Sequence, residues 1–147
     1  MKVSIKQDQT TPSVFAEIHC RDITDEVTRL KRHIVNFESF IPAKCDGENV
    51  NISYGDILYI ESVDKKTFIY TETKVCTTEK RLYELEEILD PEDFFRCSKS
   101  MIVHLNKVTA LKPEITRNIL ATLTNGEVII VSRRYAAQLK TLLGIRN

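Results

Sequence analysis

Phe94–Asn106 reads FFRCSKSMIVHLN, and the rest of the chain is organised around this stretch. It begins apolar, continues through a polar patch formed by Arg96, Ser98, Lys99 and Ser100, and then becomes apolar again. Because side chains alternate between the two faces of a strand, this pattern indicates a strand that reaches the protein surface at its polar patch. Hydroxyl and ammonium groups in such a patch suit phosphates and base edges, not a core.

The 147 residues are enough for one domain, or for one domain with a small appendage. The net charge is zero, but the charges are unevenly distributed. From Arg96 to Asn147 there are nine basic and two acidic residues, whereas the other 95 residues contain 12 basic and 19 acidic ones. This asymmetry favours a polyanionic partner for the basic part, and a chance imbalance in a soluble protein is the alternative.

The four cysteines, Cys20, Cys45, Cys76 and Cys97, are widely spaced and form no Cys-x-x-Cys motif. This spacing predicts reduced thiols in a cytoplasmic protein, rather than a disulfide scaffold or a zinc site. We find no signal-peptide pattern and no run long enough to span a bilayer. Cys97 lies beside the polar patch, but without a resolving partner we expect a buried, inert thiol rather than a sensor of oxidation.

An enzyme would need a nucleophile, a base and an orienting group brought together. Cys97, His104 and Asn106 could be imagined as a Cys-His-Asn hydrolase. No family-type motif surrounds Cys97, however, and His104 lies in an apolar run, so we expect a structural histidine and no enzyme. The four glycines are not grouped, which excludes a glycine-rich phosphate loop. We therefore expect no cofactor, metal or small-molecule substrate.

The N-terminal residues 1–40 are predicted to form a β-β-α extension. Lys2–Lys6 and Val14–Cys20 read as strands, and Asp22 as the cap of a helix. The apolar stripe of that helix recurs at spacings of four and three residues: Ile23, Val27, Leu30, Ile34 and Phe37. This extension is too small for a receiver domain with its five-stranded sheet.

Residues 41–147 are predicted to form a mainly β domain with small helices. Asp46-Gly47 and Asn125-Gly126 are hairpin signals. Helices are expected at Glu79–Leu89 and from Ser132 onward. Besides the Phe94 stretch, the expected strands are Val50–Ser53, Asp56–Ser62, Thr67–Thr71, Lys74–Thr77, Lys107–Lys112, Asn118–Thr124 and Glu127–Val131.

Three predicted loops carry polar and basic side chains that suit nucleic acid. These side chains are Lys65 and Lys66 at a hairpin tip, Ser98 and Lys99 in the polar patch, and Arg133 and Arg134 at the start of the last helix. Together such loops could line one edge of the domain and track a duplex, with Lys and Arg neutralising phosphates and an Arg binding a guanine edge. Three unrelated solvated loops are the alternative.

Residues from about Ile41 to Leu143 resemble the LytTR DNA-binding domain of bacterial transcriptional regulators. Several separated blocks match in the right order over about 100 of the 147 residues. The blocks are Asp56–Ser62, Leu82–Leu89, Phe94–Val103, and Asn125-Gly126 followed by Val131–Tyr135.

The resemblance implies a mostly antiparallel fold of about ten short strands with small helices. Family members insert loops into successive major grooves and generally bind direct repeats in promoters, often as dimers. The base-reading positions correspond to Lys66, Thr67, Ser98, Lys99 and Arg134 in this chain. With their neighbours, the expected DNA-binding residues are Lys65, Lys66, Thr67, Arg96, Ser98, Lys99, Arg133 and Arg134. Ser98 stands where the family often has His, Lys99 where it has Arg or Asn, and His104 where it often has Asn.

Since only the extension precedes this domain, the chain resembles the small stand-alone members of the family. Those often lie beside genes for small membrane proteins thought to hold them inactive, and such a partner is our hypothesis here. The extension either covers one end of the sheet or provides a surface for dimerisation or inhibitor docking. We favour dimerisation, because a small strand pair has an edge to protect. We thus expect a cytoplasmic, homodimeric regulator that binds double-stranded DNA; the alternative is a protein-interaction module whose basic face binds an acidic partner.

Overall fold

The computed structural model describes residues 1–36 and 39–143, and the chain divides into two compact units, Met1–Phe37 and Glu38–Asn147. Unit 1 contains the helix α1 (Asp25–Asn36). The side-chain oxygen of Thr24 accepts the backbone N–H of Val27 at 3.4 Å, so Thr24 rather than Asp22 stands at the helix start. Phe37, the last residue of the predicted stripe, lies outside the described residues.

The two strands predicted in unit 1 are wrong, because residues 1–36 contain no strand. The alternating apolar residues have nothing to pack against: Val3 is 81% exposed, Ile5 96% and Val14 101%. An isolated pair of short strands is at best marginally stable in water unless one face is buried. Alternation alone was therefore a misleading signal in this segment.

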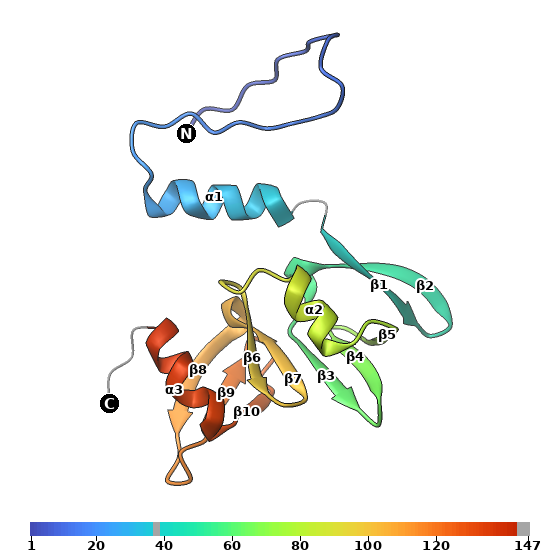
Figure 1. The fold of residues 1–147 in the computed structure, drawn as a ribbon, viewed down its shortest axis with the longest axis vertical. Helices are drawn as coiled ribbons and strands as arrows, with labels where there is room; N and C mark the ends of the chain where they lie inside the picture. The colour runs from blue at the N-terminus through green and yellow to red at the C-terminus, as the bar shows by residue number, and fades with distance from the viewer. Residues whose placement is uncertain (37–38, 144–147) are drawn as a thin grey trace. The chain divides into compact units, whose positions relative to one another are not determined.

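Unit 2 is built from two antiparallel sheets (Figure 1). The seven-stranded sheet has the order β2-β1-β5-β4-β3-β7-β6, and the three-stranded sheet has the order β10-β9-β8. The bounds are β1 Phe40–Cys45, β2 Glu48–Ser53, β3 Tyr59–Val63, β4 Lys66–Tyr70, β5 Val75–Thr78, β6 Phe94–Ser98, β7 Met101–His104, β8 Val108–Pro113, β9 Ile119–Leu123 and β10 Val128–Val131. The predicted fold of about ten short antiparallel strands is confirmed, as are the hairpins at Asp46-Gly47 and Asn125-Gly126.

Short helices complete unit 2. They are the single 3-10 turns η1 (Tyr54–Asp56) and η2 (Leu105–Lys107), and the α-helices α2 (Leu82–Ile88) and α3 (Arg133–Leu142). α2 is shorter than the predicted Glu79–Leu89, because Arg81 has an extended backbone and precedes the helix. The N–H of Arg81 donates to the carboxylate of Glu84 at 3.1 Å, which caps the helix start. α3 begins directly after Ser132, as predicted.

The stretch that organises the chain is a hairpin, not the single strand predicted. β6 and β7 pair with Phe95 opposite Val103, and the register shifts at Cys97, which forms a bulge. The polar patch is thus the turn of this hairpin. Period-two alternation does not separate one strand that leaves the sheet from two strands that turn back, because both place polar residues between apolar ones.

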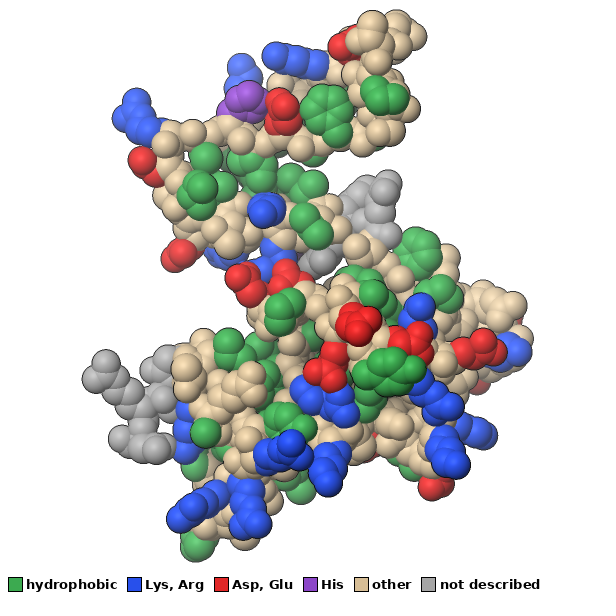
Figure 2. All heavy atoms as spheres, viewed as in Figure 1, with side chains coloured by type: hydrophobic (Ala, Val, Ile, Leu, Met, Phe, Trp, Pro, Cys, Tyr) green, Lys and Arg blue, Asp and Glu red, His purple; other side chains and the backbone are tan. Residues whose placement is uncertain are grey.

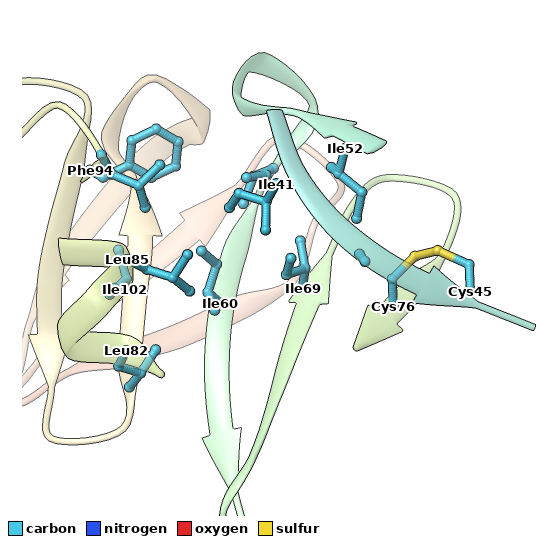
Figure 3. Packing of buried hydrophobic residues seen from close by; sticks show 13 residues of the cluster. Ile41, Cys45, Ile52, Ile60, Ile69, Cys76, Leu82, Leu85, Phe94 and Ile102 are labelled. Atoms are coloured by element: carbon cyan, nitrogen blue, oxygen red, sulfur yellow. A yellow bond between two sulfur atoms is a disulfide. The ribbon is translucent and has the colours of Figure 1, made fainter. Parts of the chain in front are cut away.

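The hairpin lies between two hydrophobic cores, which explains its apolar ends. One core gathers Phe94 and Ile102 with α2 and the seven-stranded sheet (Figure 3). The other gathers Phe95 and Val103 with α3 and the three-stranded sheet. Neighbouring residues on each strand therefore serve opposite cores, and the hairpin fixes α2 and α3 relative to the sheets.

Reduced thiols were predicted, but Cys45 and Cys76 form a disulfide that joins β1 to β5 (Figure 3). The two cysteines lie 31 positions apart. The ladder pairs Lys44 with Thr77, which sets the next residues of the two antiparallel strands opposite each other. Sequence spacing does not reveal this partnership, because it depends on sheet order. Cys20 is free and exposed, and Cys97 is free and buried.

Candidate nucleic-acid interface

The three segments predicted to bind DNA lie along one edge of unit 2. The N–H of Ser62, near the end of β3, donates to the carbonyl of Ser100 at 2.8 Å, and this brings the β3–β4 turn beside the β6–β7 turn. The N–H of Ser132 donates to the carbonyl of Cys97 at 2.9 Å, and this brings the start of α3 beside the same β6–β7 turn. We call the segments 64–66, 98–100 and 132–134 the basic edge. Figure 2 shows Lys and Arg side chains along this lower edge of unit 2.

The β3–β4 turn presents Lys65 and Lys66, which are both exposed. Asp64 and Lys65 have backbone φ angles of 50° and 67°, the left-handed conformation of a tight two-residue hairpin turn. The guanidinium of Arg81 donates to the carbonyl of Lys65 at 2.7 Å. The backbone of this turn is thereby anchored to the start of α2 while its ammonium groups project into solvent.

Thr67, predicted to read bases with Lys66, does not face the basic edge. Its side chain is only 3% exposed, and it is paired with Ser62 on one side and Thr78 on the other in the centre of the sheet. The alternation along β4 explains this, because Lys66 and Thr67 point to opposite faces. We therefore remove Thr67 from the set of candidate contacts.

The β6–β7 turn presents Lys99, which is exposed, beside the half-buried Ser98. The side-chain oxygen of Ser98 accepts the N–H of Ser100 at 3.2 Å, which closes the turn locally. The thiol of Cys97 points inward toward the carbonyl of Met101, 3.5 Å away. Lys99 therefore stands at the tip of a turn whose backbone is fixed from both sides.

Arg96 reaches this turn, but its guanidinium is occupied by the protein itself. Nε donates to the carbonyl of Ser98 at 2.7 Å, and one terminal nitrogen donates to the carbonyl of Lys99. The other terminal nitrogen forms an ion pair with Glu86 of α2. A planar guanidinium that binds two carbonyls and one carboxylate acts as a clamp. Through these contacts Arg96 positions the turn.

The start of α3 presents Arg133 and Arg134, which are both exposed. Ala136 and Leu139 bury the opposite side of the helix in the second core, which directs the two arginines outward. The guanidinium carbon of Arg134 lies 5.7 Å from the ring centroid of Tyr135. The first turn of α3 contains no acidic residue. The positive dipole end of a helix adds to the attraction for phosphate.

A fourth segment adjoins this edge that was not predicted from the sequence. The side-chain oxygen of Asn118 accepts the N–H of Arg133 at 2.9 Å, so the β8–β9 turn contacts the start of α3. Arg117, beside Asn118, is exposed. No local motif marked this turn, because its place depends on the pairing of β9 with β10.

The imagined Cys-His-Asn hydrolase site does not form. Burial of Cys97 raises the pKa of its thiol to about 12, so it stays protonated at neutral pH. His104 lies in the first core, stacked on Phe94 at 4.5 Å, and its Nδ1 is 2.9 Å from the carbonyl of Ile57. Burial lowers the pKa of His104, which keeps the ring neutral. Asn106 binds Asp93 at 3.2 Å, so each of the three residues serves the fold. The structural role expected for His104 and the buried state expected for Cys97 are confirmed.

The sequence-family model described as the LytTr DNA-binding domain matches residues 47–144 of this chain. This chain belongs to the LytTR family. A solved LytTr DNA-binding domain from a Bacillus cereus response regulator superimposes with a TM-score of 0.70 and 31% identity, over 74% of this chain and 99% of that one. The LytTR resemblance inferred from the sequence is therefore confirmed.

The LytTR relatives differ in how much of their length this chain matches. The sensory transduction protein LytT of Bacillus anthracis is 32% identical over 140 residues, which are 95% of this chain and 52% of LytT. The transcriptional regulatory protein YpdB of Escherichia coli K12 is 30% identical over 89 residues, 60% of this chain and 36% of YpdB. An uncharacterised HTH-type transcriptional regulator of Staphylococcus aureus is 26% identical across 99% of both chains. The chain thus spans about half the length of LytT. Within the described residues of this LytTR protein, no helix is both long and apolar enough to cross a membrane.

Proposed function

We propose that this LytTR protein is a cytoplasmic, sequence-specific transcriptional regulator that reads direct repeats in promoters through its basic edge. The observation that carries the proposal is the convergence of three separate segments on one edge by the hydrogen bonds Ser62–Ser100 and Ser132–Cys97. Each segment presents exposed Lys or Arg side chains from a turn with a fixed backbone. A turn whose backbone is already fixed can enter a groove without the entropy cost of ordering its backbone on binding.

The charges divide naturally between phosphate contacts and base contacts. Lys65 and Lys66 on the outer turn, and Arg133 at the start of α3, suit phosphates on either side of the groove. Lys99 and Arg134 lie on the two central segments, with Ser98 beside them, and suit base edges. In this arrangement Arg134 binds a guanine, because its guanidinium fork matches the guanine acceptors O6 and N7.

We further infer that the regulator acts as a homodimer formed through unit 1. Among residues 1–35 every side chain is at least partly exposed, so unit 1 has no core of its own. One side of α1 carries Val27 and Leu30, followed by Ile34, which is 40% exposed. The first turn of α1 is acidic, with Asp25 and Glu26, while its second half is basic. Two copies of α1 packed antiparallel would place unlike charges together, as a two-fold interface requires.

Sedimentation of the full chain tests the dimer independently of DNA. We expect a dimer whose dissociation is promoted by Leu30→Glu, because the substitution places a charge in the apolar side of α1. Arg29→Gln, on another side of the same helix, is the matched control. A wild-type chain that sediments as a monomer at micromolar concentration would contradict the dimer. DNA binding by the monomer would remain possible.

Unit 1 is also the surface on which we place the hypothesised small membrane protein. Holding unit 1 at a membrane would keep the regulator away from promoters. Co-expression of a neighbouring small membrane protein should then lower promoter occupancy, and deletion of residues 1–36 should make occupancy insensitive to it. Unchanged occupancy in the first comparison would remove this partner from the account.

The function itself is tested by competition between the protein's own upstream region and random duplex at about 150 mM salt, because only the ratio under defined salt measures specificity. We expect a discrete complex that resists random competitor by ~10³-fold or more. Footprinting of that complex should show repeats one or two helical turns apart. Binding to an acidic protein partner with no sequence preference among duplexes would favour the alternative, a protein-interaction module.

A further inference from the structure

The β8–β9 turn, residues 114–117, continues the row of turns at the basic edge. Asn118 ties it to Arg133 by the 2.9 Å hydrogen bond, and β9 begins where β10 ends, with Ile119 opposite Val131. Figure 1 shows this turn beside the start of α3, at the same end of unit 2 as the β3–β4 and β6–β7 turns. It is therefore the outermost member of the row, on the side away from Lys65.

Backbone hydrogen bonds close this turn, and its side chains are exposed. The N–H of Glu114 donates to the carbonyl of Asn118 at 2.9 Å, and the N–H of Arg117 donates to the carbonyl of Glu114 at 3.0 Å. Between them, Ile115 is 104% exposed at the tip. The closed backbone thus holds the side chains of Ile115 and Arg117 outward.

Arg117 also occupies a backbone position that favours glycine. Its φ is +70°, in the left-handed region, where a side chain is sterically disfavoured. On the basic edge, the comparable left-handed position of the β3–β4 turn holds Lys65, at +67°. In the turns away from this edge the corresponding positions hold Gly47 (+81°) and Gly126 (+89°). Besides Asp64, at +50°, the left-handed residues beside the basic edge are the two cations Lys65 and Arg117, at positions where glycine would relieve strain.

We propose that the β8–β9 turn is a fourth DNA contact, which binds the duplex beyond the base pairs read by α3. Arg117 binds a backbone phosphate there, and Ile115 packs against the apolar sugar edge of the groove wall. Glu114 lies in the same turn and weakens this contact by repelling phosphate. The inference rests on the proposed function. It extends the stretch of duplex that unit 2 of each protomer contacts, outward from Arg134.

The left-handed backbone provides a clean variant. Arg117→Gly removes the guanidinium and relieves the strain, so the melting temperature should stay equal or rise. On a long operator we expect roughly two- to tenfold weaker binding and a salt slope smaller by about one, as for the loss of one phosphate contact. Glu114→Gln should strengthen binding to the same operator. Lys74→Gly, in the β4–β5 turn at the other end of the strands, is the control and should leave the affinity unchanged.

Operator length separates this inference from the proposed function. A short duplex that ends at the base pairs read by α3 should bind wild type and Arg117→Gly with equal affinity. Arg134→Ala should bind both the short and the long duplex weakly. Equal binding of wild type and Arg117→Gly to the long duplex would overturn the fourth contact and leave the regulator intact. Absence of specific binding by the wild-type chain would overturn both proposals.

Discussion

The strands of unit 2 end in turns of two different kinds. At the basic edge, the side chains of Arg81, Arg96 and Ser98 hold the turns, while the Lys and Arg side chains of the turns themselves project outward. At the opposite edge, formed by residues 71–74 and 124–127, backbone hydrogen bonds also close the turns, but here the side chains of the turns themselves bind the protein. Thr124 donates to Glu72 at 3.0 Å, and the hydroxyl of Tyr59 donates to Glu127 at 2.8 Å.

We propose that this difference separates stability from recognition within one small β domain. A side chain that closes a turn is committed to the fold, as the carboxylates of Glu72 and Glu127 are. A side chain that takes no part in holding its turn, as for Lys65 and Lys99, stays available for a ligand. Ranked by effect, four substitutions test whether stability and recognition really lie in different places.

The largest expected effect is on stability, at the disulfide. Cys45→Ser should lower the free energy of unfolding by about 2–4 kcal/mol, because the bridge closes a loop of 31 positions in the unfolded chain. Operator preference of the folded variant should stay unchanged, since neither β1 nor β5 belongs to the basic edge. Chemical denaturation under non-reducing conditions measures the first quantity, and competition binding the second. A changed operator preference would place recognition outside the basic edge.

Arg134→Ala should have the next largest effect, this time on recognition. We expect specific binding to weaken by about 1–3 kcal/mol and one base position to lose its preference, because the guanidinium reads a base edge. The free energy of unfolding should change little, since Arg134 is exposed. Titration of the operator and of its single-base variants gives the result. Equal losses on specific and random duplex would make Arg134 a phosphate contact.

Arg96→Gln should affect both properties, since Arg96 joins the fold to the edge. Loss of its charged hydrogen bonds should lower stability by about 1–2 kcal/mol, and the loosened turn should weaken the contacts of Ser98 and Lys99. Arg96→Lys distinguishes positioning from direct contact. A lysine keeps the charge but cannot bind two carbonyls and Glu86 together, so it should resemble glutamine. Full DNA affinity in Arg96→Lys would show that charge alone matters.

The smallest effect, at Lys65, should have opposite signs for the two properties. Lys65→Gly should raise stability by up to about 1 kcal/mol, because glycine suits its φ of +67°. It should also weaken binding to all duplexes by roughly two- to fivefold, as expected for one exposed phosphate contact. Thermal melting and binding to random duplex give the two values. Unchanged binding would remove the β3–β4 turn from the interface.

The sequence predicted most strands of unit 2, because their signals are local, but it did not separate β6 from β7. Asp46-Gly47 and Asn125-Gly126 require the left-handed backbone that Gly47 and Gly126 adopt, and they fix the register of their hairpins. The same local reasoning failed for Lys2–Lys6, where alternation had no sheet to pack against. It also failed at Cys45 and Cys76, which meet only because β1 lies beside β5.

The convergence of the three loops was predicted from the sequence, but the contacts of each side chain were not. Lys65, Lys66, Lys99, Arg133 and Arg134 stand exposed on one edge, as the three-loop hypothesis required. The burial of Thr67, the clamp of Arg96 and the neighbouring Arg117 depend on pairings between distant segments. Residue type alone could not distinguish an arginine that is exposed to solvent from an arginine that binds the protein's own carbonyls.

The most direct test of the basic edge is amide hydrogen exchange of the full chain with and without its operator. We predict slower exchange on DNA binding in segments 64–66, 98–100 and 132–134, and no change in segments 71–74 and 124–127 of the opposite edge. The comparison needs no substitution, so it is independent of any effect on folding. Protection of the opposite edge, with the basic edge unchanged, would contradict the account.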